Sequence, residues 1–158
     1  MLAVLGLGSN LGDREANLAG ALDRLEQLPG TKILGNSNVY ETAPFDVPSH
    51  QEDYLNCCVK LETGLDPETL LDRCLEIEAQ LGRVRVEHHG ARTLDVDLLV
   101  CEGHFSQTPR LTLPHPGILE RAFVMVPLSD LFPTHSALGL DFAAAYEAVD
   151  KSGVRLYK

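Results

Sequence analysis

The stretch YLNCCVKLETGLDPETLLDRCLEIEAQLG, residues 54–82, decides the fold class of this 158-residue chain. Between residues 54 and 62 apolar and polar positions alternate, which predicts a strand with one buried face. The buried face would carry Leu55, Cys57, Val59 and Leu61, and the opposite face Tyr54, Asn56, Cys58, Lys60 and Glu62.

A helix is expected directly after this strand. Asp66 is placed to cap it, Pro67 suits the first helical position, and Glu68 lies near the positive end of the helix dipole. The apolar face of the helix would be Leu70, Cys74, Ile77 and Leu81, with Gly82 as the C-terminal stop.

Similar patterns extend outward on both sides. Residues 2–7 predict a strand buried on both faces, followed by a tight turn and a helix that ends at Pro29-Gly30. Further strands are expected at 31–42, 93–100 and 111–113, and 118–131 should be partly helical with an interruption at Pro127. The order predicts a single domain, 1–158, with an α+β ferredoxin-like sandwich. In that fold helices cover one face of a mainly antiparallel sheet, and the other face stays open for a ligand.

Composition narrows the class of protein. Thirteen basic against 23 acidic side chains give a net charge of −10, which disfavours nucleic acid and anionic membranes as partners. No apolar run is long enough to span a bilayer and no secretory signal is recognisable at the N-terminus, so we expect a cytoplasmic protein. The cysteines form no CxxC pair and are interpreted as reduced, mostly buried thiols: Cys57, Cys58, Cys74 and Cys101.

The glycine-rich stretch GLGSNLG, residues 6–12, invites comparison with phosphate-binding loops. Gly6, Gly8 and Gly12 have the spacing GxGxxxG instead of GxGxxG, and no GK[ST] follows. We therefore interpret these glycines as a tight turn that requires a positive φ.

Asp95 and Asp97 form the most informative polar pair. At i and i+2 on a strand they project to the same side, about 7 Å apart, and such a pair suits Mg²⁺ with substrate phosphate completing its ligands. The alternative is a solvated sheet edge. The basic, His-containing loop 83–92, which includes Arg92, favours the metal, because acids for Mg²⁺ and arginines for phosphate oxygens divide the work of phosphoryl transfer.

Tyr54 and Asn56 share the polar face of their strand. An aromatic plane beside an amide can hold a flat heterocycle with donors and acceptors on its edge, although a half-exposed Tyr is also common on sheets. His115, between Pro114 and Pro116, is either a structural turn residue or a nucleotide contact.

Several segments, taken in order, resemble the 6-hydroxymethyl-7,8-dihydropterin pyrophosphokinase family of folate biosynthesis. The most specific is GARTLDVDLL at 90–99, and the resemblance covers about residues 4 to 130. The other segments are GLGSNLGDRE near the start, YETAP at 40–44, DYLN at 53–56, LGRVR at 81–85, RLTLPHP at 110–116 and ERAF at 120–123.

The resemblance implies an enzyme that transfers the β,γ-diphosphate of ATP to the pterin hydroxymethyl oxygen, releases AMP and uses two Mg²⁺ ions. It implies Asp95 and Asp97 as metal ligands and Arg83 and Arg92 as catalytic residues. The implied pterin site is Tyr54, Asn56 and Phe123, the two aromatics sandwiching the ring, with backbone groups of Thr42, Ala43, Pro44 and Phe45. The implied ATP site is Glu78, Arg83, Arg92, Arg110, Thr112, His115 and Arg121.

Two departures from the family pattern fall in the loop 83–92. His89 and Ala91 stand where many members carry Trp and Pro, which bears on how this loop closes over nucleotide. Two other classes of function stay open at the level of sequence: a noncatalytic nucleotide- or metabolite-sensing module on the same fold, and an interaction protein with an acidic surface. We expect a monomer whose ligands are ATP and the pterin.

Overall fold

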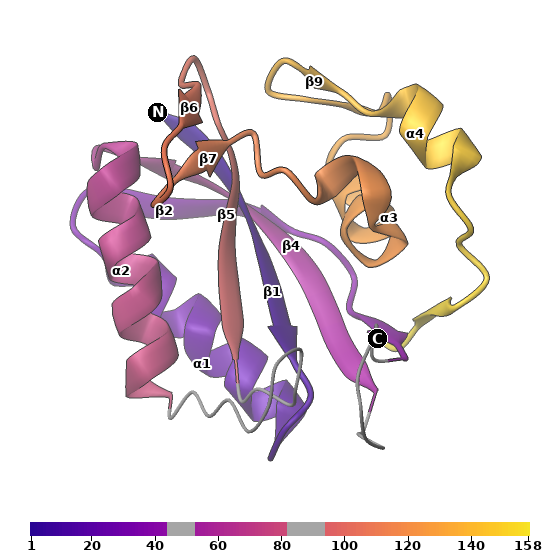
Figure 1. Ribbon diagram of the computed structural model, residues 1–158. Helices are drawn as coiled ribbons and strands as arrows, with labels where there is room; N and C mark the ends of the chain where they lie inside the picture. The colour runs from indigo at the N-terminus through magenta and orange to yellow at the C-terminus, as the bar shows by residue number, and fades with distance from the viewer. Residues whose placement is uncertain (44–52, 82–93) are drawn as a thin grey trace.

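The computed structural model describes residues 1–43, 53–81 and 94–158. Its main element is a six-stranded sheet in which every pairing is antiparallel. The strands are β1 (Leu2–Ser9), β2 (Thr31–Asn36), β3 (Tyr40–Thr42), β4 (Tyr54–Thr63), β5 (Asp95–Cys101) and β10 (Val154–Leu156). The order β10-β3-β4-β1-β5, with β2 also paired to β4, confirms the predicted α+β class and places β1 between β4 and β5 (Figure 1).

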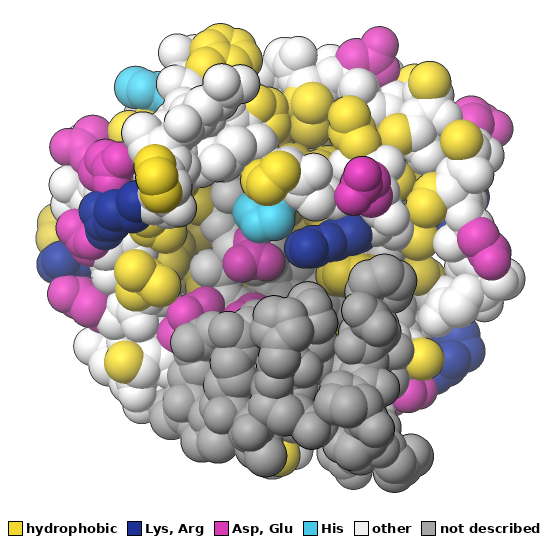
Figure 2. Space-filling model, in the orientation of Figure 1, with side chains coloured by type: hydrophobic (Ala, Val, Ile, Leu, Met, Phe, Trp, Pro, Cys, Tyr) yellow, Lys and Arg dark blue, Asp and Glu magenta, His cyan; other side chains and the backbone are white. Residues whose placement is uncertain are grey.

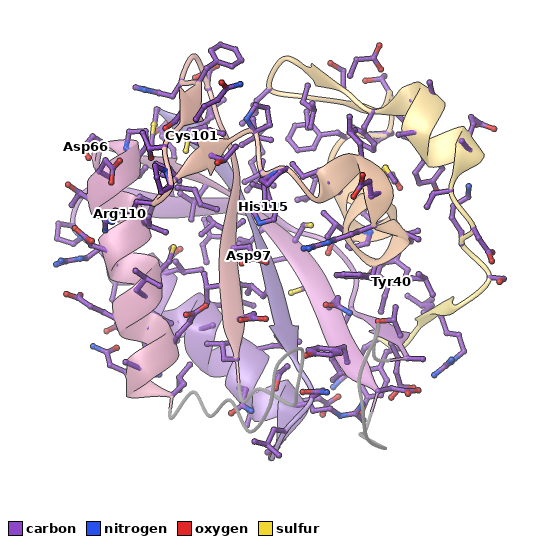
Figure 3. All side chains as sticks on the ribbon, in the orientation of Figure 1. Tyr40, Asp66, Asp97, Cys101, Arg110 and His115 are labelled. Carbon is purple, nitrogen blue, oxygen red and sulfur yellow. The ribbon has the colours of Figure 1, made fainter. Side chains whose placement is uncertain are left out.

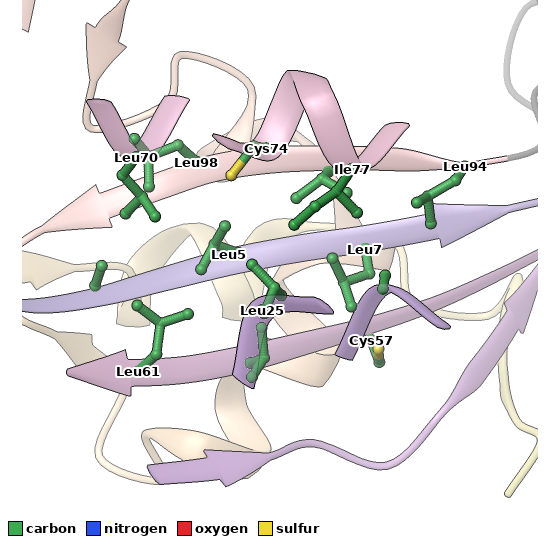
Figure 4. Packing of buried hydrophobic residues seen from close by; sticks show 14 of the residues in the cluster. Leu5, Leu7, Leu25, Cys57, Leu61, Leu70, Cys74, Ile77, Leu94 and Leu98 are labelled. Atoms are coloured by element: carbon green, nitrogen blue, oxygen red, sulfur yellow. The ribbon is translucent and has the colours of Figure 1, made fainter. Parts of the chain in front are cut away.

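Two helices cover one face of this sheet. Helix α1 (Arg14–Glu26) begins at Asp13, which accepts a hydrogen bond from the Ala16 N–H. Helix α2 (Pro67–Gln80) begins at the predicted cap Asp66, whose carboxylate accepts from the Thr69 N–H at 2.8 Å. The predicted stop, Gly82, lies outside the described residues. Figure 4 shows how the apolar faces of both helices meet the sheet, among them Leu5, Leu7, Leu25, Leu61, Leu70, Cys74, Ile77 and Leu98.

The strand predicted at 31–42 is divided into β2 and β3, which both pair with β4. The division occurs at Ser37, whose N–H donates to the Cys58 carbonyl and whose hydroxyl accepts from the Cys58 N–H. The Ser37 hydroxyl thus takes the place of a backbone carbonyl as the acceptor for the Cys58 N–H. The alternation of apolar residues in the sequence does not reveal such a side-chain partner.

Strand β5 contains a bulge that the sequence pattern did not predict. Leu5 lies opposite Leu98 and Val4 opposite Val100, so Leu99 is the extra residue. The sequence placed Val100 on the same face as Leu94, Val96 and Leu98, and this was wrong. After the bulge Val100 packs with Leu99 on the opposite face, in a second core cluster.

The second face of the sheet is not fully open, contrary to expectation. A 3-10 turn η1 (Ile118–Glu120) and helix α3 (Ala122–Leu131) pack on it, burying Ile118, Met125 and Leu128. Helix α3 also continues through Pro127, where an interruption was predicted. Proline removes one N–H from the helical ladder, but buried contacts on both sides of Pro127 stabilise the helix.

The C-terminal residues are an integral part of this second layer. The short strands β8 (Ser136–Ala137) and β9 (Leu140–Asp141) pair with each other. Earlier in the chain, after β5, the short strands β6 (Ser106–Gln107) and β7 (Thr112–Leu113) form a similar pair. Helix α4 (Ala143–Ala148) follows, and β10 returns to pair with β3. Phe142, 1% exposed, fixes this segment in the second cluster.

All four cysteines are free and buried, as the sequence predicted. Cys57 and Cys58 point to opposite faces of β4, one into each core cluster. Burial raises the pKa of Cys57 to about 12, so its thiol stays protonated at neutral pH. In the described part of the chain no helix has the length and apolar character needed to cross a bilayer.

Replacing Phe142 with alanine tests the structural role of the C-terminal segment. We expect Phe142→Ala to lower the free energy of unfolding by about 3–5 kcal/mol, because it removes a fully buried ring from the second cluster. Phe105, 83% exposed, is the matched control, and Phe105→Ala should change it by less than about 0.5 kcal/mol. Urea denaturation measures both. Equal small effects would show that the segment does not contribute to the core.

Candidate functional site

A stripe of small residues forms the floor of a hollow on the second face of the sheet. Gly6 and Gly8 lie inside β1, at positions whose side chains would point into this hollow. The cross-strand register places polar side chains on both sides of the glycines. Gly8 is paired with Asn56 of β4 and with Asp95 of β5, and Gly6 with Cys58 and Asp97.

Gly8 is needed because a side chain would not fit. A Cβ atom on Gly8 would lie 2.9 Å from the Asn56 Oδ1 atom, closer than real Cβ atoms approach. The tight-turn interpretation therefore holds only for Gly12, whose φ is 75°. Gly6 and Gly8 belong to the site, and their i, i+2 spacing was the signal that they share one face of a strand.

The first of two adjoining compartments, called here the β4 compartment, has a volume of about 280 Å³. Tyr54 and Asn56 line it from β4 and Phe123 from the first turn of α3. Asn56 is 8% exposed, and its Nδ2 donates to the Thr42 Oγ1 at 3.0 Å, which orients the amide. An oriented amide in a pocket that two aromatic side chains also line can select a flat ring by its edge.

The second, called here the α2 compartment, has a volume of about 330 Å³. Leu71 and Leu75 of α2 supply an apolar wall, and Glu78, Arg110 and Thr112 supply polar groups. Arg110 forms ion pairs with the α2 carboxylates Glu68, at 2.8 Å, and Asp72. An apolar wall beside charged and hydroxyl groups suits a ligand with a flat base and phosphates.

Asp95, Asp97 and His115 line both compartments. Figure 2 shows acidic, basic and histidine side chains meeting in a hollow, and Figure 3 shows His115 close to Asp97, with Arg110 to one side against α2. Because adjacent strands lie about 4.8 Å apart, the two aspartates on β5 are about 10 Å across the sheet from Tyr54 and Asn56 on β4. A group bound between the compartments would therefore lie against the aspartates.

Glu78 connects α2 to the strand that carries the aspartates. It is 5% exposed, and its Oε2 accepts a hydrogen bond of 2.7 Å from the N–H of Val96, the residue between Asp95 and Asp97. Strand β5 is an edge strand, so this N–H points away from the ladder. The Glu78 carboxylate satisfies this N–H and so holds in place the part of β5 that carries both aspartates.

His115 has a defined tautomer. The Gly117 N–H donates to its Nδ1 at 3.1 Å, so in the neutral ring the proton is on Nε2. Burial, followed by the positive charge of Arg121, lowers the pKa of His115. Arg121 itself lies against Gly117, where a Cβ would approach its Cζ to 2.6 Å, and over the ring of Phe123 at 5.8 Å.

The paired aspartates have the chemistry of a magnesium site. Both are half-buried, and hard carboxylate oxygens on one face of a strand are ligands that Mg²⁺ accepts one or two at a time. Residues 1–43, 53–81 and 94–158 contain no cluster of three or more His, Cys, Asp or Glu side chains that could hold a metal. The donor set on β5 thus fits an ion that takes its other ligands from water and substrate phosphate.

Comparison with known proteins identifies the family. Residues 4–133 match the model of the 7,8-dihydro-6-hydroxymethylpterin-pyrophosphokinase family. The chain belongs to this family.

Relatives agree with this assignment over nearly the whole chain. The chain is 43% identical to a 2-amino-4-hydroxy-6-hydroxymethyldihydropteridine pyrophosphokinase of Methylorubrum extorquens, covering 96% of both sequences. It is 36% identical to a protein of the same name from Bacillus subtilis, covering 99% of this chain and 90% of that one. A crystal structure of HPPK-DHPS in complex with substrates shares the fold, with a TM-score of 0.68 at 14% identity. This chain aligns over 93% of its own length and spans 43% of that solved chain.

Membership of the pyrophosphokinase family confirms the resemblance read from the sequence, and the structure brings most of the implied residues together. Asp95, Asp97 and His115 are shared between the compartments. The β4 compartment gathers Tyr54, Asn56, Arg121 and Phe123, and the α2 compartment Glu78, Arg110 and Thr112. Thr42 and Ala43 line a neighbouring cavity of about 530 Å³ with Arg121 and Phe123. Pro44, Phe45, Arg83 and Arg92 lie outside the described residues.

The sequence did not reveal several residues that shape the two compartments. These include the glycines of β1, Gly117 beneath Arg121, and the apolar pair Leu71 and Leu75. The two leucines are spaced i, i+4 on α2, so they share a face, but Leu75 is 49% exposed and lies beside the main apolar stripe.

The titration of His115 tests the electrostatics of the site. We expect its midpoint below the ordinary value of 6.5, so the ring is neutral at pH 7, because burial and Arg121 disfavour the imidazolium. The ring proton resonances followed by NMR against pH measure it. Arg121→Gln should raise the midpoint, whereas Arg110→Gln should leave it unchanged. A midpoint above 6.5 in the unmodified protein would contradict this assignment.

Proposed function

We propose that this chain carries out the family reaction, transfer of the pyrophosphoryl group of ATP to the hydroxymethyl oxygen of 6-hydroxymethyl-7,8-dihydropterin, a step of folate biosynthesis. A bond forms between the pterin oxygen and the β-phosphorus, and the bond between the β-phosphorus and the oxygen that bridges it to the α-phosphate breaks, so AMP leaves with that oxygen. The hydroxymethyl proton is released, and the products are AMP and the pterin diphosphate. The observation that carries this assignment is two adjoining compartments that share a pair of aspartates.

The β4 compartment is proposed to hold the pterin. Tyr54 and Phe123 come from different layers, so a flat ring can bind between them, and the Asn56 amide faces its edge. The hydrogen bond from Asn56 to Thr42 supports this role, since an amide with one fixed partner presents its remaining donor and acceptor in a defined direction.

The α2 compartment is proposed to hold ATP. Leu71 and Leu75 can pack against the base, while Thr112 and Arg110 can bind phosphate or ribose oxygens. Arg110 would exchange its carboxylate partners on α2 for phosphate, which forms charge-assisted hydrogen bonds of the same kind with a guanidinium. The neutral Nε2–H of His115 can donate to a phosphate oxygen at the boundary between the two ligands.

Asp95 and Asp97 are proposed to hold Mg²⁺, and two Mg²⁺ ions are expected when ATP is bound. When bound, the metal would neutralise the charge of the triphosphate and help to align the β-phosphorus with the pterin oxygen. Arg121, beside His115 and Phe123, supplies positive charge from the chain itself. Arg83 and Arg92 remain predicted catalytic residues for the same purpose.

The noncatalytic sensing module weighed from the sequence is disfavoured by membership of an enzyme family. The remaining expectations stay predictions: a monomer, a single domain over 1–158, a cytoplasmic location, and neither nucleic acid nor membrane as a partner.

Asp97→Asn tests the assignment of the metal ligands. The change keeps the size of the side chain and removes its charge, so we expect kcat/KM for AMP formation to fall on the order of 100-fold or more at fixed Mg²⁺. Asp23→Asn, an exposed carboxylate on α1, is the matched control and should retain full activity. Unchanged turnover by Asp97→Asn, with the fold confirmed by circular dichroism, would refute the role of this pair.

Gly8→Ala tests the pterin compartment. The new Cβ would displace Asn56, so we expect pterin affinity to fall about tenfold and ATP affinity to stay within about twofold. Isothermal titration with each ligand measures the two affinities. Gly64→Ala is the control, because a Cβ there meets nothing within 4 Å. Equal losses for both ligands would argue against separate compartments.

A further inference from the structure

Four charged side chains form a network at the edge of the sheet behind the β4 compartment, called here the edge clamp: Arg14, Glu41, Asp53 and Arg155. Arg14 Nη1 donates to the Glu41 Oε2 and to the Asp53 carbonyl, both at 2.8 Å. Arg155 Nη2 donates to the Asp53 Oδ2 at 2.7 Å and to the Glu41 Oε1 at 3.2 Å. The clamp thus joins α1, β3, the start of β4 and the C-terminal strand.

The clamp lies next to residues that line the proposed pterin site. Glu41 precedes Thr42, which accepts the hydrogen bond from Asn56, and Asp53 precedes Tyr54. Thr42 and Tyr54 are themselves opposite each other and are the last pair of the β3–β4 ladder. The edge clamp therefore secures both strands at the end of the ladder that carries the pterin-binding groups.

Backbone pairing alone holds this end weakly. Strands β3 and β10 have three residues each, and the terminal pair of a short ladder is where a sheet opens most easily. Arg155 lies opposite Glu41 in the β10–β3 register, so its side chain reaches across the end of both β3 and β4. The ring of Tyr157, 5.7 Å from the Arg14 Cζ, adds a contact from the same segment.

The electrostatics agree with a formed network. The hydrogen bond from Arg14 is the largest influence that holds the pKa of Glu41 below its ordinary value, and Arg155 acts in the same direction. Arg14 and Glu41 are 21% and 24% exposed, so water screens this pair less than a fully exposed one. Connected charges with shared partners contribute more than isolated surface pairs.

We propose that Arg14 and Arg155 are positioning residues for the pterin: through Glu41 and Asp53 they fix Thr42, Asn56 and Tyr54 in the geometry that binds the ring. This inference rests on the proposed function and adds the C-terminal strand to the substrate-binding apparatus. The α2 compartment lies across the sheet on β5, so the edge clamp should affect the pterin and leave ATP affinity unchanged.

Arg155→Ala is the direct test, since this side chain is 53% exposed and its loss leaves the core intact. We expect the Kd of the pterin to rise about three- to tenfold, with the Kd of ATP and kcat at saturating pterin within about twofold. Arg155→Lys should recover part of the affinity by retaining the charge. Asp53→Asn and the double variant of Asp53 and Arg155 complete a double-mutant cycle. If the two side chains act together, the double variant loses less pterin-binding free energy than the sum of the two single losses.

Lys158→Ala is the matched control. Lys158 belongs to the same C-terminal segment, and its side chain pairs with Glu15 at 3.2 Å. Within the described residues this side chain forms no hydrogen bond with Glu41 or Asp53. It should leave pterin affinity unchanged. Calorimetric melting of each variant confirms that binding is measured on folded protein.

Two results would overturn the inference in distinguishable ways. If the unmodified protein binds pterin and forms AMP but Arg155→Ala matches it in pterin Kd, the edge clamp has no positioning role and the proposed function stands. An equal loss of pterin and ATP affinity would likewise assign Arg155 a general structural role. Failure of the unmodified protein to bind pterin or form AMP would instead refute the proposed function itself.

Discussion

The structure depends on the two different faces of β1. One face presents Leu5 and Leu7 to α1 and α2, and the other presents Gly6 and Gly8 to the site. Because side chains alternate along a strand, a shift of one residue in its pairing would bury the glycines and expose the leucines. The packing of the core therefore fixes the register in which Gly8 lies between Asn56 and Asp95, and with it the whole floor of the site.

The two faces of the sheet also differ in what they carry: the main hydrophobic core lies on one face and the hollow with the polar side chains on the other. On the helix side, two apolar helix faces and the sheet form one continuous cluster, shown in Figure 4. On the other side, α3 and the C-terminal segment cover part of the sheet and leave a hollow where β1 has no side chains. Glu78 is the exception that links the two, since its carboxylate, on a packed helix, accepts a hydrogen bond from the backbone N–H between Asp95 and Asp97.

Local charge explains how an acidic protein can bind anionic ligands. The net charge of −10 would repel phosphates at long range, but Arg110 lines the α2 compartment, Arg121 lines the β4 compartment, and the aspartate pair lines both. The acids suit a divalent cation and the arginines suit phosphate oxygens, so each sign has a partner in the proposed complex. At the sheet edge the same charge types serve a different purpose, because there they neutralise each other in the edge clamp.

The sequence by itself determined the α+β class, the cap of α2, the faces of β4 and the aspartate pair, because caps and side-chain alternation are local properties. Family-specific segments also determined the family. The sequence did not reveal the split of β2 from β3, the bulge in β5 or the continuous helix through Pro127, since each depends on a partner distant in sequence. Only the tertiary structure decided that Gly6 and Gly8 form the floor of a hollow and that the C-terminal strand pairs with β3 beside it. Those roles come from cross-strand neighbours and packed layers, which are set by the register of the sheet and not by the order of residues along the chain.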